Sequence, residues 1–93
     1  MPMAIAVRQL MDLHHPLKTE FPQYQQIITI LDSTDERFHA LMEEYDRIDD
    51  RICRIEENLE YATDQEIEEL KLRRVHLKDW LYHTLQKKRA AAA

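Results

Sequence analysis

Residues 38–62 read FHALMEEYDRIDDRICRIEENLEYA, and this stretch decides the fold. Its apolar and aromatic residues recur at alternating intervals of three and four. They are Phe38, Leu41, Tyr45, Ile48, Ile52, Ile55, Leu59 and Ala62. This alternation is the a and d spacing of a heptad, which gathers apolar side chains along one edge of an α-helix. The stretch therefore predicts a long amphipathic helix whose apolar edge packs against another helix.

The composition of the chain is typical of an all-α protein and excludes several kinds of site. Among its 93 residues there is no glycine, and the three prolines all precede residue 23. A chain without glycine has no glycine-rich phosphate loop and no nucleotide-binding fingerprint. The single cysteine, Cys53, excludes a disulfide within the chain and a four-cysteine zinc site.

The N-terminal segment and the net charge favour a cytoplasmic protein without a membrane-spanning segment. Residues 1–11 are mildly apolar, but Arg8 and Gln9 interrupt them, and the segment is too short to span a bilayer. It also lacks the basic, apolar and small-residue order of a signal peptide. The net charge of -5 repels anionic lipid and nucleic acid at long range.

Capping residues and prolines set the expected helix boundaries. Pro22 suits the first turn of a helix, where its missing N–H is not needed. Ser33 and Thr63 each stand three residues before a glutamate, which is the capping-box pattern of a helix start. The helices expected from these signals cover residues 22–31, 34–60 and 64–87. A short helix is also expected in an N-terminal extension, residues 1–13, ahead of a hairpin domain over residues 14–93.

The short connection between the two long helices predicts that they run antiparallel. The apolar residues of the second helix are Ile67, Leu70, Leu77, Leu81 and Leu85. Matching the two apolar edges places Tyr45 near Leu81, and it places Ile52 near Arg74, which stands where an apolar residue is expected. The acidic half of the first helix then faces the basic half of the second. The predicted fold is an all-α antiparallel two-helix hairpin (a coiled coil), preceded by one or two short N-terminal helices.

Several short motifs stand in a fixed order around the heptad stretch. They are His14-His15-Pro16-Leu17, Glu20-Phe21-Pro22-Gln23-Tyr24, Phe38-x-x-Leu41, Tyr45-x-x-Ile48-Asp49-x-x-Ile52-x-x-Ile55-Glu56, Leu70-Lys71-x-x-Arg74 and Leu77-Lys78-Asp79. Over residues 14–86 the chain resembles the YdcH-like family of small bacterial helical-hairpin proteins, although Gln23 replaces the acidic residue usual there. The resemblance implies a helical hairpin in a bacterial cytoplasm. It implies no activity, because the family is catalogued as a domain of unknown function.

The sequence predicts no metal site and no cofactor. His76, Asp79 and His83 share one face of the last helix, but the two histidines lie about 10.5 Å apart along its axis. Such a spacing does not let them converge on one metal ion. Glu36 and His39 have the spacing of half a di-iron motif, which needs a second such motif and further glutamates.

The sequence also predicts no catalytic nucleophile, so the protein is not expected to be an enzyme. Ser33 is the only serine and is interpreted as a helix cap. Cys53 is expected off the apolar edge, beside acidic residues that raise the pKa of a thiol and disfavour the reactive thiolate.

Arg74 is the most informative polar residue, because it occupies a core position of the second helix. Its stem could lie along the apolar edge while the guanidinium reaches water. Alternatively, Arg74 and Asp49 form a partly buried ion pair that determines the register or the oligomeric state. The sequence leaves both interpretations open.

A candidate interface lies outside the paired edges, at Leu72, Val75, Trp80 and Tyr82. Either the helix at residues 24–31 folds back onto these side chains, or a second hairpin covers them. We therefore expect a non-enzymatic interaction or adaptor module that self-associates as a dimer or higher homo-oligomer and binds a protein partner.

The alternative function is nucleic-acid binding through the basic last helix. Its cations are Lys71, Arg73, Arg74, Lys78, Lys87, Lys88 and Arg89. They scatter around the helix axis rather than forming a stripe, which disfavours this alternative.

Overall fold

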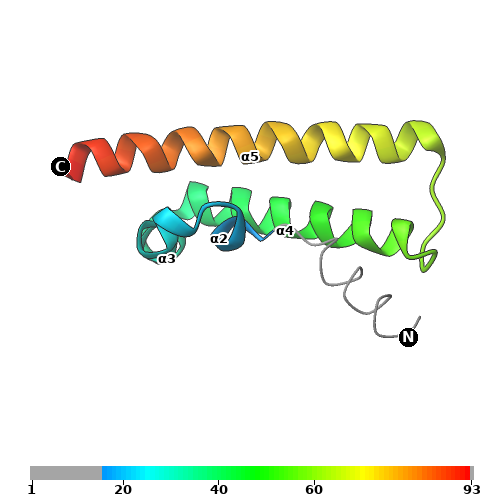
Figure 1. The fold of residues 1–93 in the computed structure, drawn as a ribbon, viewed down its shortest axis with the longest axis horizontal. Coiled ribbons are helices and arrows are strands. Elements are labelled where there is room, and N and C mark those ends of the chain that lie inside the picture. Colours follow the sequence, from blue (N-terminus) through cyan, green and yellow to red (C-terminus); the bar gives the residue numbers. More distant parts are fainter. Residues whose placement is uncertain (1–15, 93) are drawn as a thin grey trace.

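The computed structural model describes residues 16–92, so the short helix expected in the extension at residues 1–13 lies outside the described part. The elements are α2 (Leu17–Glu20), the 3₁₀ turn η1 (Pro22–Tyr24), α3 (Gln25–Thr34), α4 (Glu36–Glu56) and α5 (Asp64–Ala92). No strand occurs within residues 16–92. The all-α hairpin predicted from the heptad pattern is confirmed (Figure 1).

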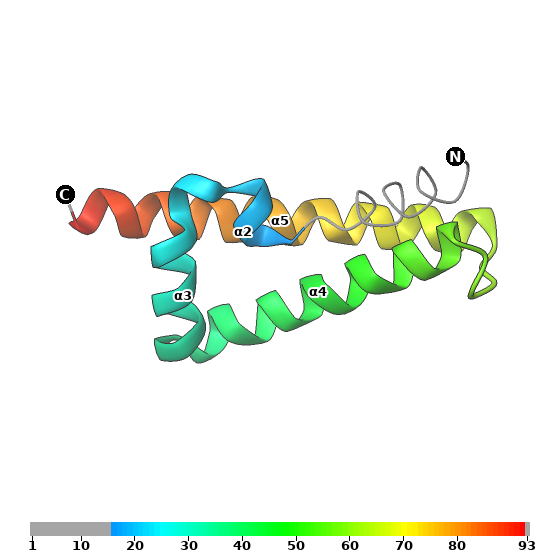
Figure 2. The ribbon, with the colours of Figure 1, turned by 60° about the horizontal axis from the view of Figure 1, so that its bottom comes forward.

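The two long helices form an antiparallel pair that is closed at one end and open at the other. Figure 2 shows α4 and α5 close together at their connecting loop and diverging away from it. The short helix α3 lies across the open end and packs on both long helices. The structure is therefore a wedge-shaped hairpin whose open end is filled by the N-terminal elements.

The hydrophobic core lies at this open end. Its buried side chains come from every described helical element and are Leu17, Tyr24, Ile28, Leu31, Phe38, Tyr45, Leu77, Leu81 and Leu85. Tyr45 and Leu81, which the matching of edges placed together, both belong to this cluster. The core thus depends on α2, η1 and α3 as well as on the hairpin.

The residue that caps the N-terminus of α4 is not the one that the capping-box pattern predicted. The backbone N–H of Phe38 donates to the carboxylate of Asp35 at 3.0 Å, so Asp35 is the N-cap. Ser33 lies inside α3, and its hydroxyl is 3.0 Å from the carbonyl oxygen of Ile30. The predicted cap at Ser33 is wrong because α3 continues to Thr34 before the chain becomes extended.

The start of α5 agrees with the prediction. The backbone N–H of Glu66 donates to the hydroxyl of Thr63 at 3.1 Å, and the helix begins at Asp64. At the other end α5 continues past the predicted boundary at residue 87 to Ala92. Alanine has the highest helix propensity of all residues, which accounts for the extra turn.

The helix α4 ends at Glu56, four residues earlier than predicted. Asn58 has a φ of 62°, in the left-handed region where glycine is the usual residue and asparagine the common substitute. The N–H of Leu59 donates to the carbonyl of Arg54 at 2.8 Å, and the N–H of Asn58 donates to that of Ile55 at 3.1 Å. These bonds form a Schellman motif, which ends the helix although the heptad spacing continues to Leu59.

Candidate functional site

An ion pair is buried between the two long helices. The guanidinium of Arg74 donates to the carboxylate of Asp49 at 2.8 Å. The side chain of Arg74 is 18% exposed and that of Asp49 only 5% exposed. Of the two interpretations left open, the structure therefore contains the partly buried pair. Its role in register or oligomeric state stays a prediction.

Two further ion pairs join α5 to α4 among the described residues. Arg73 pairs with Glu44 at 2.8 Å, and Lys71 pairs with Glu56 at 3.0 Å. The charges of α4 and α5 therefore neutralise each other in part, as the distribution of acids and bases predicted.

Lys78 departs from that prediction. It was expected to face the acidic half of α4, but it pairs with Glu20 at the end of α2, at 2.7 Å. The two residues meet although they are 58 positions apart in the sequence. Lys78 therefore holds the N-terminal elements against the hairpin.

The four residues of the candidate interface divide into two pairs. Trp80 and Tyr82 are half-buried and pack on the core. The ring of Tyr82 lies 4.8 Å from that of Phe21 and 6.0 Å from that of Tyr24, so η1 and the residue before it fold back onto α5.

Leu72 and Val75 remain on the surface. Their exposed fractions are 57% and 50%. They lie one turn apart, on the side of α5 opposite its buried leucines. The exposed part of the candidate interface is therefore an aliphatic pair in the middle of α5.

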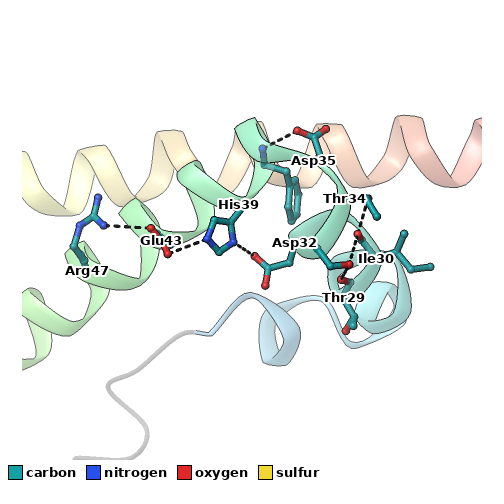
Figure 3. Close-up of polar contacts among 10 residues, drawn as sticks. Thr29, Ile30, Asp32, Thr34, Asp35, His39, Glu43 and Arg47 are labelled. Atoms are coloured by element: carbon teal, nitrogen blue, oxygen red, sulfur yellow. Dashed lines mark hydrogen bonds and ion pairs between the residues drawn. The ribbon is translucent and has the colours of Figure 1, made fainter.

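A histidine bridges the corner between α3 and α4 (Figure 3). One ring nitrogen of His39, Nδ1, lies 2.8 Å from the carboxylate of Asp32 in α3, and the other, Nε2, lies 2.9 Å from that of Glu43 in α4. A neutral imidazole has only one N–H to donate, so two carboxylate partners favour the imidazolium form. The hydrogen bond with Asp32 and the negative charge of Glu43 raise the pKa of His39 above 6.5. The sequence pattern indicated only the spacing from Glu36 to His39. The partners in the structure are Glu43, one turn later in α4, and Asp32, seven residues earlier in α3.

The pKa of His39 is expected to exceed 6.5 in an NMR pH titration of its ring protons, and Asp32→Asn should lower it. Because the folded-state pKa is raised, the bridge stabilises the fold fully below pH 6.5, and that contribution disappears as the pH rises through the folded-state pKa. Asp79→Asn, which removes a carboxylate on α5, is the matched control and should leave the titration of His39 unchanged. An unchanged pKa in Asp32→Asn would contradict the bridge.

The structure brings together no metal ligands and no reactive nucleophile in its described part. Within residues 16–92, no group of three His, Cys, Asp or Glu side chains is placed to hold a metal ion. Cys53 is 1% exposed, so the expectation that it lies off the core is wrong. Burial, with Asp49 nearby, raises the pKa of its thiol to about 11, which leaves almost no thiolate near neutral pH.

The comparison with known families gives one match. A family model described as "Protein of unknown function (DUF465)" matches residues 38–85, which cover most of α4, the loop and most of α5. This match agrees with the resemblance to YdcH-like proteins, but it leaves the motifs at His14–Leu17 and Glu20–Tyr24 outside. No curated protein and no solved structure matches the chain. None of the helices within residues 16–92 is long and apolar enough to cross a membrane.

Proposed function

The chain belongs to the DUF465 family of proteins of unknown function, and from this premise we propose that it is a non-enzymatic helical-hairpin adaptor that associates with itself through the outer face of α5. The observation that carries the proposal is the exposed aliphatic pair Leu72 and Val75. Large aliphatic side chains gathered on an exposed helix face are typical of contact surfaces. A protein of this size also has little core of its own, which favours a second copy as the occupant. The buried lone thiol, Cys53, is in keeping with a reducing compartment such as the cytoplasm.

Nucleic-acid binding is the weaker proposal, because four of the seven basic side chains that it would use are occupied. Lys71, Arg73, Arg74 and Lys78 all form ion pairs with carboxylates of the same chain. Binding to phosphate would require these pairs to break. A gel shift of RNA or DNA that weakens steeply with salt would favour nucleic-acid binding over self-association.

Self-association is expected to be lost when charge is placed on the outer face of α5. In light scattering over a wide range of concentration, the wild-type mass should rise to at least twice that of one 11.3 kDa chain. Leu72→Glu combined with Val75→Glu should hold the mass at one chain, because like charges and unsatisfied carboxylates disfavour the contact.

The control for this experiment is Leu59→Glu. Leu59 is 69% exposed and lies in the loop, so this variant adds one charge elsewhere on the surface and should associate like the wild type. A wild-type chain that keeps the mass of one copy at every concentration would contradict the proposal. So would an outer-face variant that associates as well as the wild type.

A further inference from the structure

The outer face of α3 is unusually free of charge. The helix reads QQIITILDST, and its only charged residue, Asp32, is turned to the corner where it contacts His39. One third of the whole chain is charged, so this face differs from the rest of the surface. Ile30 stands on it with 57% of its surface exposed.

The hydroxyl groups of α3 are already hydrogen-bonded within the helix. The hydroxyl of Thr29 donates to the carbonyl of Gln25 at 3.0 Å, and that of Thr34 donates to the carbonyl of Ile30 at 2.7 Å. Ser33 makes the same kind of bond to Ile30 at 3.0 Å. Figure 3 shows the side chain of Thr34 turned back toward Ile30 of its own helix. Covering a polar group is costly mainly when it loses a partner in water. This face can therefore be covered at a low desolvation cost.

Two shallow hollows flank Ile30. One is lined by Lys18, Gln25, Gln26 and Thr29 as well as Ile30, and it has a volume of about 440 Å³. The other lies between α3 and the end of α5, has a volume of about 350 Å³, and is lined by Ile27, Ile30, Leu31, Lys88 and Ala91. Ile30 therefore forms a knob between two holes. A helix laid across it could place apolar side chains one turn apart on either side.

The hollows carry unpaired positive charge. Lys18 lines the first and Lys88 the second, and neither forms an ion pair with another residue of the described part, 16–92. The lysines at residues 71 and 78 of α5 are both paired with carboxylates of the chain. An occupant that covers Ile30 would thus meet a cation on each side, which selects for carboxylates beside its apolar residues.

We propose that the outer face of α3, between Lys18 and Lys88, docks an amphipathic helix of a protein partner that carries acidic residues beside its apolar face. An apolar helix face seated in a shallow groove is a common way of recognising a partner segment. An anionic membrane would meet the same two lysines, but the two hollows beside Ile30 fit individual side chains of a helix, so we commit to the helix. This surface is separate from Leu72 and Val75, so docking and self-association can fail independently.

Two synthetic amphipathic peptides test the proposal with the full chain. Both carry the same leucine face, and one has glutamate and the other lysine at the flanking positions. Methyl NMR spectra should show that the glutamate peptide shifts the signals of Ile27, Ile30 and Ala91. The lysine peptide should bind at least about fivefold more weakly, because two surface charge contacts become repulsive.

Two sets of variants give the expected changes in affinity. Ile30→Glu should weaken binding of the glutamate peptide at least about tenfold, because it removes the central apolar contact and repels the flanks. Leu59→Glu adds the same charge to a similarly exposed aliphatic position in the loop after α4, outside both proposed surfaces, and should not change this affinity. Lys18→Glu combined with Lys88→Glu should reverse the preference between the two peptides.

Three results would overturn the proposal. The first is no methyl shift with either peptide, or shifts confined to Leu72 and Val75. The second is binding to anionic phosphatidylserine vesicles that Ile30→Glu abolishes, without binding of either peptide, which would assign the face to a membrane. The third is a shift of the Ile30 methyls that depends on the concentration of the protein alone, which would assign the face to a second copy.

Discussion

Replacing Arg74 with methionine is expected to lower the free energy of unfolding by about 3 kcal/mol. The substitution leaves the carboxylate of Asp49, which is 5% exposed, without its 2.8 Å cationic partner. Removing one partner of a buried pair costs ~3–5 kcal/mol, and the 18% exposure of Arg74 places this pair at the lower end. Small domains are stable by only ~5–15 kcal/mol, so the loss should be plain in urea titrations at neutral pH.

The neighbouring residue Arg73 provides the matched control. Its ion pair with Glu44 is of equal length, but the two side chains are 52% and 30% exposed. Exposed pairs contribute less than about 1 kcal/mol, so Arg73→Met should have a small effect. The double variant Asp49→Asn with Arg74→Met should recover most of the loss, because no buried charge remains. Equal losses from Arg73→Met and Arg74→Met would contradict the buried pair.

Replacing Phe38 with alanine is expected to lower the free energy of unfolding by ~3–5 kcal/mol. Phe38 is 0% exposed and belongs to the cluster where α3 crosses the diverging long helices. Truncation removes the apolar contacts of the ring and leaves a cavity that the surrounding helices cannot fill completely. The loss approaches the whole stability of a small domain, so thermal melting by circular dichroism should show a large fall in Tm.

Leu59 is the control for Phe38, because both residues belong to the same heptad edge. Leu59 is the last residue of the Schellman motif, outside α4, and is 69% exposed. Leu59→Ala should therefore change the stability by less than about 0.5 kcal/mol. Similar losses for the two substitutions would mean that the coiled-coil edge extends through the loop, against the structure.

The sequence predicted the two long helices and their antiparallel pairing because both signals are local. A heptad edge identified α4, and the cap at Thr63 identified the first residue of α5. The register followed from matching two apolar edges, and Tyr45 and Leu81, which it placed together, belong to the same buried cluster. Arg74 stood out because a charged residue occupied an apolar position.

The errors have separate physical reasons. Ser33 fits a capping box as well as Asp35 fits a cap, and only the observed length of α3 decides between them. Asn58 ends α4 by adopting a positive φ, and the heptad spacing of apolar residues gives no indication of this backbone conformation. Cys53 is buried because the packed face of a helix in a globular protein is wider than the a and d positions.

The candidate site depended on a part of the fold that the sequence offered only as one of two alternatives, the folding back of the helix at residues 24–31. Nothing in the heptad pattern indicates that α4 and α5 diverge, or that α3 lies across the open end. The bridge from Asp32 to His39 and the hollows beside Ile30 both arise from that crossing. Residues on separate helices meet there because of tertiary packing, which periodicity does not describe.

The divergence of the two long helices has a consequence for the order of folding. The hydrogen-bonded side chains that join Arg51 to Glu60 are nine residues apart in sequence, and those that join Arg74 to Asp49 are 25 apart. Glu20 and Lys78, at the open end, are 58 apart. The entropy lost on closing a chain segment grows with its length, although slowly, so contacts near the loop are favoured to form first. The N-terminal elements are therefore expected to dock last, on a hairpin that has already formed near its loop.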